Sequence, residues 1–230
     1  MDKHSNKYNI MKRNILLTAI LLAMTTLASA QNYDWAFFSR YADANAQVTT
    51  TPKAVIMGDS ITEGWFEKRA EFFSDNNIQG RGISGQTSSH MLVRFRRDVI
   101  DLDPEYVMIL AGTNDIALNN GQISLENIFG NIVSMCELAK ANKIKPIIAS
   151  VLPCSYYPWR PEVKDPAGQI IRLNEMLQKY AKENKIRYID FHTILKDEKN
   201  GLPEKHAKDG VHPGADCYKI MEEMVLKELR

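Results

Sequence analysis

Four short apolar runs, each of strand length and continuous rather than alternating, constrain the fold of this 230-residue chain. They occupy residues 54–58, 106–112, 146–151 and 186–190. Strands covered on both faces have this pattern, which is typical of parallel sheets. Amphipathic segments with a helical period follow at 89–100, 125–141, 167–184 and 214–229. The alternation predicts an α/β protein, a three-layer α/β/α sandwich with a mostly parallel sheet of about five strands.

The N-terminus has the pattern of a secretory signal peptide. Lys12 and Arg13 precede an apolar run over 15–28, and the run ends in an A-x-A cleavage motif. About 14 apolar residues are too few to span a bilayer, so we expect no stable membrane insertion. We predict a signal peptide over 1–30, with Met11 as an alternative start, and a mature domain over 31–230. Export would place that domain in the periplasm or outside the cell.

Aromatic residues at roughly helical spacing within 32–45 predict a helix near the start of the mature domain. An N-terminal helix buried in the fold is the alternative to a signal peptide for the first apolar run.

Composition excludes several classes of protein. A hydrophobic share of 44%, a charged share of 25% and a net charge of +1 are ordinary for a globular enzyme and give no reason to expect nucleic acid as a partner. Cys136, Cys154 and Cys217 are far apart and lack C-x-x-C spacing, which excludes a zinc ribbon or a disulfide scaffold. A bridge between Cys154 and Cys217 and three buried free thiols both remain compatible with export.

Polar residues follow the apolar runs, where a parallel sheet gathers its catalytic groups. Asp59 and Ser60 follow the first run, and Asn114 follows the run over 106–112. Asp209 and His212 stand three apart just before the last helical segment. Taken singly, each is as well explained as a cap, turn or loop residue. Together they offer a hydroxyl, an amide donor and an imidazole with a neighbouring carboxylate, which are the parts of a serine hydrolase.

These blocks stand in order as GDSIT, GISGQTS, GTND and DGVHP between residues 58 and 213. The chain therefore resembles the SGNH hydrolases, also called GDSL esterases or lipases, over nearly all of 31–230. The resemblance implies that Ser60 is the nucleophile, His212 the base and Asp209 its orienting partner. It also implies an oxyanion hole made by the backbone amides of Ser60 and Gly85 and the side chain of Asn114. No metal or organic cofactor is implied.

Asp59 and Asp115, which belong to the same blocks, are expected to brace the site rather than react.

Residues 80–85 read GRGISG and match the G-x-G-x-x-G spacing of dinucleotide-binding loops. That motif requires a strong preceding strand, and the segment before these glycines has low strand propensity, so the resemblance to an oxyanion loop at Gly85 is preferred. The G-x-S-x-G motif of α/β-hydrolases is absent. His192 and His206 lack the H-E-x-x-H or H-x-H spacing of a metal site and are expected on the surface or in loops.

The substrate is expected to be a small or glycan ester. Trp65, Tyr156, Tyr157 and Trp159 are candidates for a wall on which a sugar stacks, or else pack a proline-rich loop. Because no long apolar lid is visible, short acyl groups are favoured, and O-acetyl groups on carbohydrates are the preferred substrate. A lysophospholipase or platelet-activating-factor-acetylhydrolase-like lipid esterase is the alternative. A catalytically inactive glycan-binding module is the alternative of another class. The oligomeric state stays open.

Overall fold

The computed structural model describes residues 34–230, which belong to two compact units, residues 34–39 and Arg40–Arg230. The predicted signal peptide lies outside the described residues. In the smaller unit the Asp34 carboxylate accepts hydrogen bonds from the amides of Phe38 and Ser39, both at 2.7 Å. Phe37 has a φ of 56°. The predicted helix over 32–45 is therefore wrong for most of its described length, because Asp34 closes a turn, and helix α2 covers only Ala42–Ala46.

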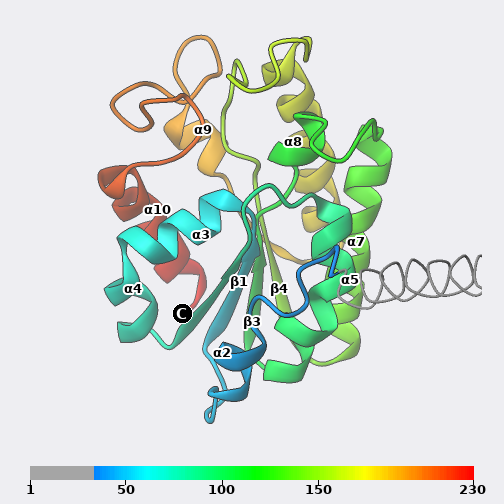
Figure 1. The fold of residues 1–230 in the computed structure, drawn as a ribbon, viewed down its shortest axis with the longest axis vertical. Coiled ribbons are helices and arrows are strands. Elements are labelled where there is room, and N and C mark those ends of the chain that lie inside the picture. Colours follow the sequence, from blue (N-terminus) through cyan, green and yellow to red (C-terminus); the bar gives the residue numbers. More distant parts are fainter. Residues whose placement is uncertain (1–33) are drawn as a thin grey trace, which may run out of the picture. The chain divides into compact units, whose positions relative to one another are not determined.

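The larger unit is built on a five-stranded sheet in which all neighbouring strands are parallel (Figure 1). The strands, in chain order, are β1 Ala54–Gly58, β2 Ile78–Gly82, β3 Tyr106–Ile109, β4 Lys145–Ala149 and β5 Arg187–Ile189. Their order across the sheet is β2-β1-β3-β4-β5. The predicted three-layer α/β/α sandwich is confirmed.

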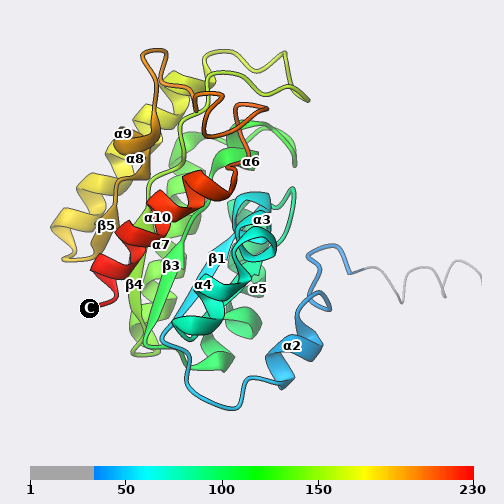
Figure 2. The ribbon, with the colours of Figure 1, turned by 90° about the vertical axis from the view of Figure 1, so that its left-hand side faces the viewer.

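Helices cover both faces of the sheet (Figures 1 and 2). On one face lie α3 Ser60–Lys68, α4 Ala70–Asp75, α9 Phe191–Leu195 and α10 Ala215–Glu228. On the other lie α5 Ser88–Asp98, α7 Leu125–Ala141 and α8 Pro166–Glu183. Two short elements, the 3-10 turn η1 Ile100–Leu102 and helix α6 Thr113–Ile116, flank β3. The four predicted helical segments correspond to α5, α7, α8 and α10.

The continuous apolar runs are explained by two separate cores. Along β1, Val55 and Met57 belong to the core under α5, α7 and α8, whereas Ala54 and Ile56 belong to the core under α3, α4 and α10. Successive side chains of a strand point to opposite faces. Both faces are buried here, so every position of β1 must be apolar or small, and the alternation of a half-exposed strand is lost.

Strand β2 shows why the G-x-G-x-x-G spacing at residues 80–85 does not indicate a dinucleotide-binding loop. It begins at Ile78, within a segment of low strand propensity, and contains Gly80 and Gly82. A Cβ at Gly82 would lie 2.2 Å from the backbone nitrogen of Glu63, so the glycine is what lets α3 approach this edge strand. Gly85 lies in the following loop with a φ of 77°. The glycines therefore serve packing and loop geometry.

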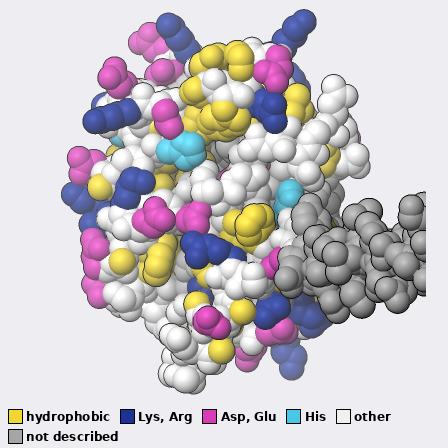
Figure 3. Space-filling model, viewed as in Figure 1, with side chains coloured by type: hydrophobic (Ala, Val, Ile, Leu, Met, Phe, Trp, Pro, Cys, Tyr) yellow, Lys and Arg dark blue, Asp and Glu magenta, His cyan; other side chains and the backbone are white. Residues whose placement is uncertain are grey.

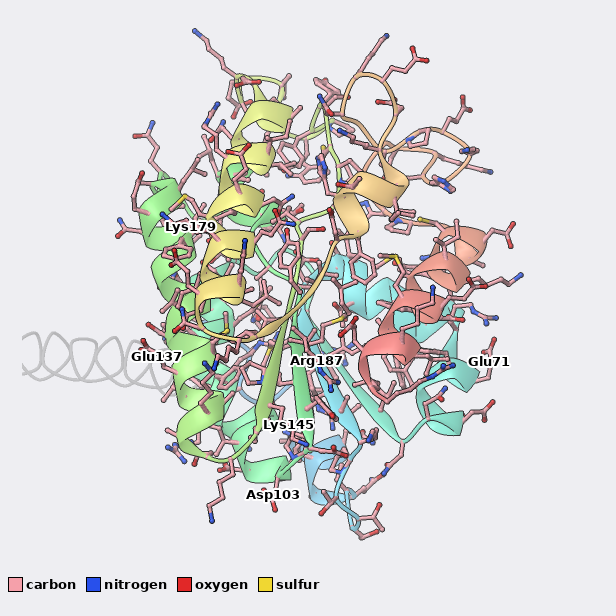
Figure 4. The ribbon with its side chains drawn as sticks, turned by 180° about the vertical axis from the view of Figure 1, so that it is seen from behind. Glu71, Asp103, Glu137, Lys145, Lys179 and Arg187 are labelled. Atoms are coloured by element: carbon pink, nitrogen blue, oxygen red, sulfur yellow. The ribbon has the colours of Figure 1, made fainter. Side chains whose placement is uncertain are left out.

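The two ends of the sheet differ in character. The loops after β1, β2 and β3 meet at the carboxyl ends, which point upward in Figure 1. Lys145 and Arg187 lie at the opposite, amino-terminal end (Figure 4), each 5.0–5.1 Å from the ring centre of Tyr106. Within residues 34–230, the candidate catalytic groups therefore lie in the loops at the carboxyl ends of the strands.

The three cysteines are free and buried, so the Cys154–Cys217 bridge is not formed. Within residues 34–230, no helix is long and apolar enough to cross a membrane.

Candidate active site

Ser60 is the first residue of α3 and follows directly on β1. Asp59 caps the helix, its carboxylate accepting a hydrogen bond from the amide of Ile61 at 2.9 Å. The Tyr218 hydroxyl of α10 donates to the Ile61 carbonyl at 2.8 Å. These bonds fix the strand-to-helix turn and leave the half-buried Ser60 hydroxyl at the helix N-terminus, where backbone N–H groups favour negative charge.

His212 and Asp209 reach Ser60 from the loop before α10. His212 Nε2 lies 3.0 Å from Ser60 Oγ, and His212 Nδ1 lies 2.7 Å from Asp209 Oδ2. The other carboxylate oxygen of Asp209 accepts the amides of Val211 and His212 at 2.9 and 2.8 Å. Gly210, with a φ of 75°, makes this tight loop. The loop therefore sets the position of the imidazole by its own hydrogen bonds.

The direction of this hydrogen-bond chain follows from the state of Asp209. Partial burial opposes ionisation of its carboxyl, but the hydrogen bonds from the His212 amide and ring and from the Val211 amide outweigh it and lower the pKa of Asp209. An ionised carboxylate only accepts, so His212 Nδ1 is the donor in that bond. His212 Nε2 is then left as the acceptor for the Ser60 hydroxyl proton.

Asn114 stands at the start of α6, after Gly112, whose φ of 125° turns the chain out of β3. Its side chain is 3% exposed. Nδ2 donates to the Gln86 carbonyl at 3.0 Å, and Oδ1 accepts from Asn119 Nδ2 at 2.6 Å. An amide nitrogen carries two hydrogens, so one N–H of Asn114 remains available for a further acceptor.

The loop that carries Gly85 is tied to α3. The amide of Ser84 donates to Glu63 at 2.9 Å, and the Ser84 hydroxyl makes a second bond to the same carboxylate. Ile83 donates its amide to the Gly58 carbonyl at 3.2 Å. Gly85 itself is exposed and has open space around its Cβ position.

Asp115 joins α6 to α5. Its carboxylate accepts the amide and the hydroxyl of Ser88 at 2.9 and 2.6 Å, and Asn131 of α7 donates to the same hydroxyl at 2.9 Å. Burial raises the pKa of Asp115, and the bonds from Ser88 oppose this rise. Asp59 and Asp115 both make the bracing hydrogen bonds expected of them.

A fully buried cation beneath the site was missed in the sequence. Arg94 of α5 pairs with Asp98 at 2.8 Å, and its guanidinium also donates to the carbonyls of Gly58 and Arg81 and to the side chain of Gln86. Burial lowers the pKa of Arg94, and Asp98 counteracts this. The one signal in the sequence is an Arg beside Met91 and Phe95, on the apolar side of a predicted helix, with an acid four residues on.

Two of the four residues predicted to form an aromatic wall are buried, and two are exposed. Trp65 is completely buried, stacked between Phe72 and Tyr218, so its assignment to substrate contact is wrong. Trp65 lies on the side of α3 that faces the sheet, more than one turn after Ser60, and its ring is buried in the apolar core under α3, α4 and α10. Tyr157 is also buried, at 1% exposure.

Tyr156 and Trp159 remain exposed, at 53% and 39%. The Trp159 ring centre lies 6.0 Å from that of His212. A group of hydrophobic side chains shows at the upper end of the molecule in Figure 3, above the carboxyl ends of the strands. Trp159 thus borders the imidazole, while Tyr156 belongs to the same loop.

His192 departs from expectation, because it is buried at the start of α9 rather than exposed. Its amide donates to the hydroxyl of Ser150 at 2.9 Å, which draws the first turn of α9 against the sheet. His206 is half-buried in the loop before α10. Among residues 34–230, no three His, Cys, Asp or Glu side chains are grouped to hold a metal ion.

A model of the GDSL-like lipase/acylhydrolase family matches residues 56–220. The chain belongs to this family. It is therefore an acylhydrolase, an enzyme that hydrolyses esters. A GDSL-like lipase from Bacteroides thetaiotaomicron is 46% identical, with 85% of this chain and 98% of that chain covered and a TM-score of 0.82. A candidate acylhydrolase from Bacteroides fragilis is 45% identical, with 86% and 98% covered and a TM-score of 0.84.

More distant relatives share the fold or part of the sequence. An acetyl xylan esterase matches at 15% identity over 77% of this GDSL-like chain and 99% of its own, with a TM-score of 0.63. Two curated proteins match over only part of their lengths. A Bacillus subtilis lipoprotein is 35% identical over 34% of this chain and 33% of its own length. An Escherichia coli N-acylneuraminate cytidylyltransferase is 24% identical over 73% of this chain and 38% of its own length.

Proposed function

We propose that this GDSL-like acylhydrolase is a serine esterase that removes acetyl groups from carbohydrates. The observation that carries the proposal is the unbroken chain from Ser60 Oγ to His212 Nε2 at 3.0 Å and from His212 Nδ1 to Asp209 at 2.7 Å. A serine hydroxyl is a weak nucleophile until a base within hydrogen-bond reach takes its proton. In this line of hydrogen bonds His212 would act as that base, with the Asp209 carboxylate behind it.

In the proposed reaction, Ser60 Oγ attacks the ester carbonyl while His212 Nε2 takes the hydroxyl proton. Asp209 holds the ring and stabilises the imidazolium that forms. The negative oxygen of the tetrahedral intermediate accepts from the amides of Ser60 and Gly85 and from the spare N–H of Asn114. Collapse breaks the bond to the alcohol, which leaves with the proton from His212. Water then attacks the acyl-enzyme with His212 again as base, releasing the acid and restoring Ser60.

The substrate class is argued from the rim of the site. Trp159 exposes ring surface beside His212, Tyr156 is exposed in the same loop, and an aromatic face is a suitable platform for the apolar face of a sugar. The acetyl xylan esterase that shares the fold acts on an acetylated polysaccharide. The predicted signal peptide would bring the enzyme to glycans outside the cytoplasm.

The serine mechanism is tested with p-nitrophenyl acetate and the Ser60→Ala variant. We expect kcat to fall by about 10³-fold or more, because the nucleophile is lost while the oxyanion donors remain. Circular dichroism of the variant controls for folding. Equal rates for the two proteins would overturn the mechanism, and a wild-type protein that binds acetylated glycans without hydrolysing them would be a binding module.

The substrate is tested with a series of p-nitrophenyl esters from C2 to C12, run beside acetylated xylo-oligosaccharides. The proposal predicts a maximum at C2 and release of acetate from the oligosaccharides. A maximum at C8 or longer would contradict the acetyl assignment and support the lipid esterase alternative, while leaving the serine mechanism intact.

A further inference from the structure

We propose that Asn119 and Trp159 are positioning residues that fix the orientation of the Asn114 side-chain amide, and with it one donor of the oxyanion hole. The inference rests on the proposed esterase function for its catalytic consequence. The geometry behind it is a line of three hydrogen bonds. Trp159 Nε1 donates to Asn119 Oδ1 at 3.0 Å, and Asn119 Nδ2 donates to Asn114 Oδ1 at 2.6 Å. Asn114 Nδ2 then donates to the Gln86 carbonyl at 3.0 Å.

Both ends of this line allow only one direction. An indole N–H of tryptophan can only donate, and a backbone carbonyl such as that of Gln86 can only accept. Each asparagine between them has one accepting oxygen and one donating nitrogen. The oxygen of Asn119 must therefore face Trp159, which turns its nitrogen toward Asn114. The orientation of Asn114, often ambiguous for an amide, is set by the line as a whole.

The orientation matters because Asn114 is almost completely buried, so water cannot replace a lost partner. If the amide were reversed, its oxygen would lie 3.0 Å from the Gln86 carbonyl oxygen. The same reversal would present an acceptor, not an N–H, to the developing oxyanion. The observed orientation leaves the second N–H of Asn114 free to stabilise that charge.

The backbone is bent to bring Asn119 into this position. Leu118 has a φ of 57°, a left-handed conformation that disfavours a leucine by about 1 kcal/mol. The turn lets the Asn119 amide donate to the Asn114 carbonyl at 3.0 Å, so both residues are held side by side by backbone and side chain. Strain of this kind persists where the surroundings hold it in place, and it is common at functional sites.

Trp159 links this line to the rim of the site. Its ring lies 6.0 Å from the His212 ring and is 39% exposed, while its N–H belongs to the Asn114 line. The loop between β4 and α8, which carries Trp159, is therefore connected to Asn114 by two hydrogen bonds through Asn119. We expect a substrate that packs on the indole to raise kcat, because it restrains the residue that orients the donor.

The test compares Asn119→Asp with Asn119→Ala on p-nitrophenyl acetate. A carboxylate at 119 accepts from both neighbours, so it would draw the Asn114 nitrogen toward itself and turn the oxygen to Gln86 and the oxyanion. We expect kcat to fall by about 10²-fold or more with KM little changed, as when an oxyanion donor is removed. Asn119→Ala leaves Gln86 to orient Asn114 and should lose about 10-fold, a milder effect than reversal of the donor.

Asn120→Asp is the matched control, because it adds the same charge one residue along at an exposed position. Trp159→Phe keeps a ring at the rim but removes the N–H, and it should lower kcat by less than Asn119→Asp. If Asn119→Asp retains the kcat of Asn120→Asp, the inference is wrong. A rise in KM with kcat unchanged would also contradict it.

A second measurement is independent of catalysis. In ¹⁵N-labelled protein, Trp159→Phe should shift the side-chain NH₂ resonances of Asn114, and Asn120→Asp should leave them in place. Unchanged Asn114 resonances in Trp159→Phe would overturn the line of hydrogen bonds even if Asn119→Asp fails to fold. If Trp159→Phe shifts the Asn114 resonances but the wild-type protein hydrolyses no ester, the esterase function is rejected and the line of hydrogen bonds is retained.

Discussion

Burial of the Asp59 carboxyl leads to a specific prediction: Asp59→Asn stabilises the protein at neutral pH. Asp59 is 1% exposed, and burial raises the pKa of its carboxyl from 3.8 to about 6, although the Ile61 amide and the nearby His212 favour the charged form. The carboxylate accepts from the Ile61 amide at 2.9 Å. An asparagine oxygen can accept the same bond, so the helix cap survives the substitution.

The sign follows from proton binding in the two states. In the unfolded chain an aspartate titrates near pH 4, so between about pH 4 and pH 6 the folded wild type binds a proton that the unfolded chain has lost. Raising the pH through this window therefore removes stability from the wild type. A pKa difference of about 2 corresponds to roughly 3 kcal/mol, complete above about pH 6 and absent below about pH 4. Asparagine does not ionise and avoids this loss.

The assay is urea unfolding followed by tryptophan fluorescence at pH 4 and pH 8. Titrating groups that do not interact with Asp59 occur in both proteins and cancel in the difference between them. The variant should gain about 3 kcal/mol relative to the wild type between the two pH values. Asp43→Asn removes an exposed carboxyl on α2 and serves as the matched control. A difference between Asp59→Asn and wild type that does not depend on pH would refute the reasoning.

The other predictions concern the base, the buried cation and the thiols. Asp209→Asn should lower kcat on p-nitrophenyl acetate by about 10³- to 10⁴-fold, because a neutral amide cannot stabilise the imidazolium, and a loss under tenfold would contradict that role. Arg94→Met should lower the free energy of unfolding in urea by about 3–5 kcal/mol, because a buried carboxylate is left unpaired. Burial raises the pKa of Cys136 to about 12 and those of Cys154 and Cys217 to about 11. Ellman's reagent at pH 8 should therefore find all three thiols only after unfolding, and fast reaction of the native protein would show an accessible thiol.

The parts of the fold that the sequence predicts are those set by local pattern. The buried strands β1, β3 and β4 read as continuous apolar runs, and the long helices read as amphipathic periods. Strand β2 escaped because its glycines lower strand propensity, and their purpose, the close approach of α3 to Gly82, exists only in the folded structure. The helix predicted over 32–45 is too long, because the Asp34 carboxylate closes a turn with the amides of Phe38 and Ser39 and α2 begins only at Ala42.

The same distinction holds at the site. Ser60, Asn114 and the Asp209–His212 pair could be predicted as site residues because each stands in a short block next to a strand or helix end. Trp65 was misplaced, since a sequence shows that a tryptophan follows the nucleophile but not which side of α3 it occupies. Asn119 escaped notice because its partners come from α6 and from a loop 40 residues away.

Arg94 shows how stability and catalysis are joined beneath the site. Its guanidinium bonds the carbonyls of Gly58 and Arg81 at the ends of β1 and β2, at 3.0 and 2.9 Å. It also holds the side chain of Gln86, whose carbonyl receives the Asn114 amide. Arg94 thus bonds Gly58, two residues before Ser60, and Gln86, which follows Gly85 and accepts from Asn114. Because a buried polar network stabilises the fold only when its members are paired, the loss of Arg94 would remove a partner from Gly58, Arg81, Gln86 and Asp98 at once.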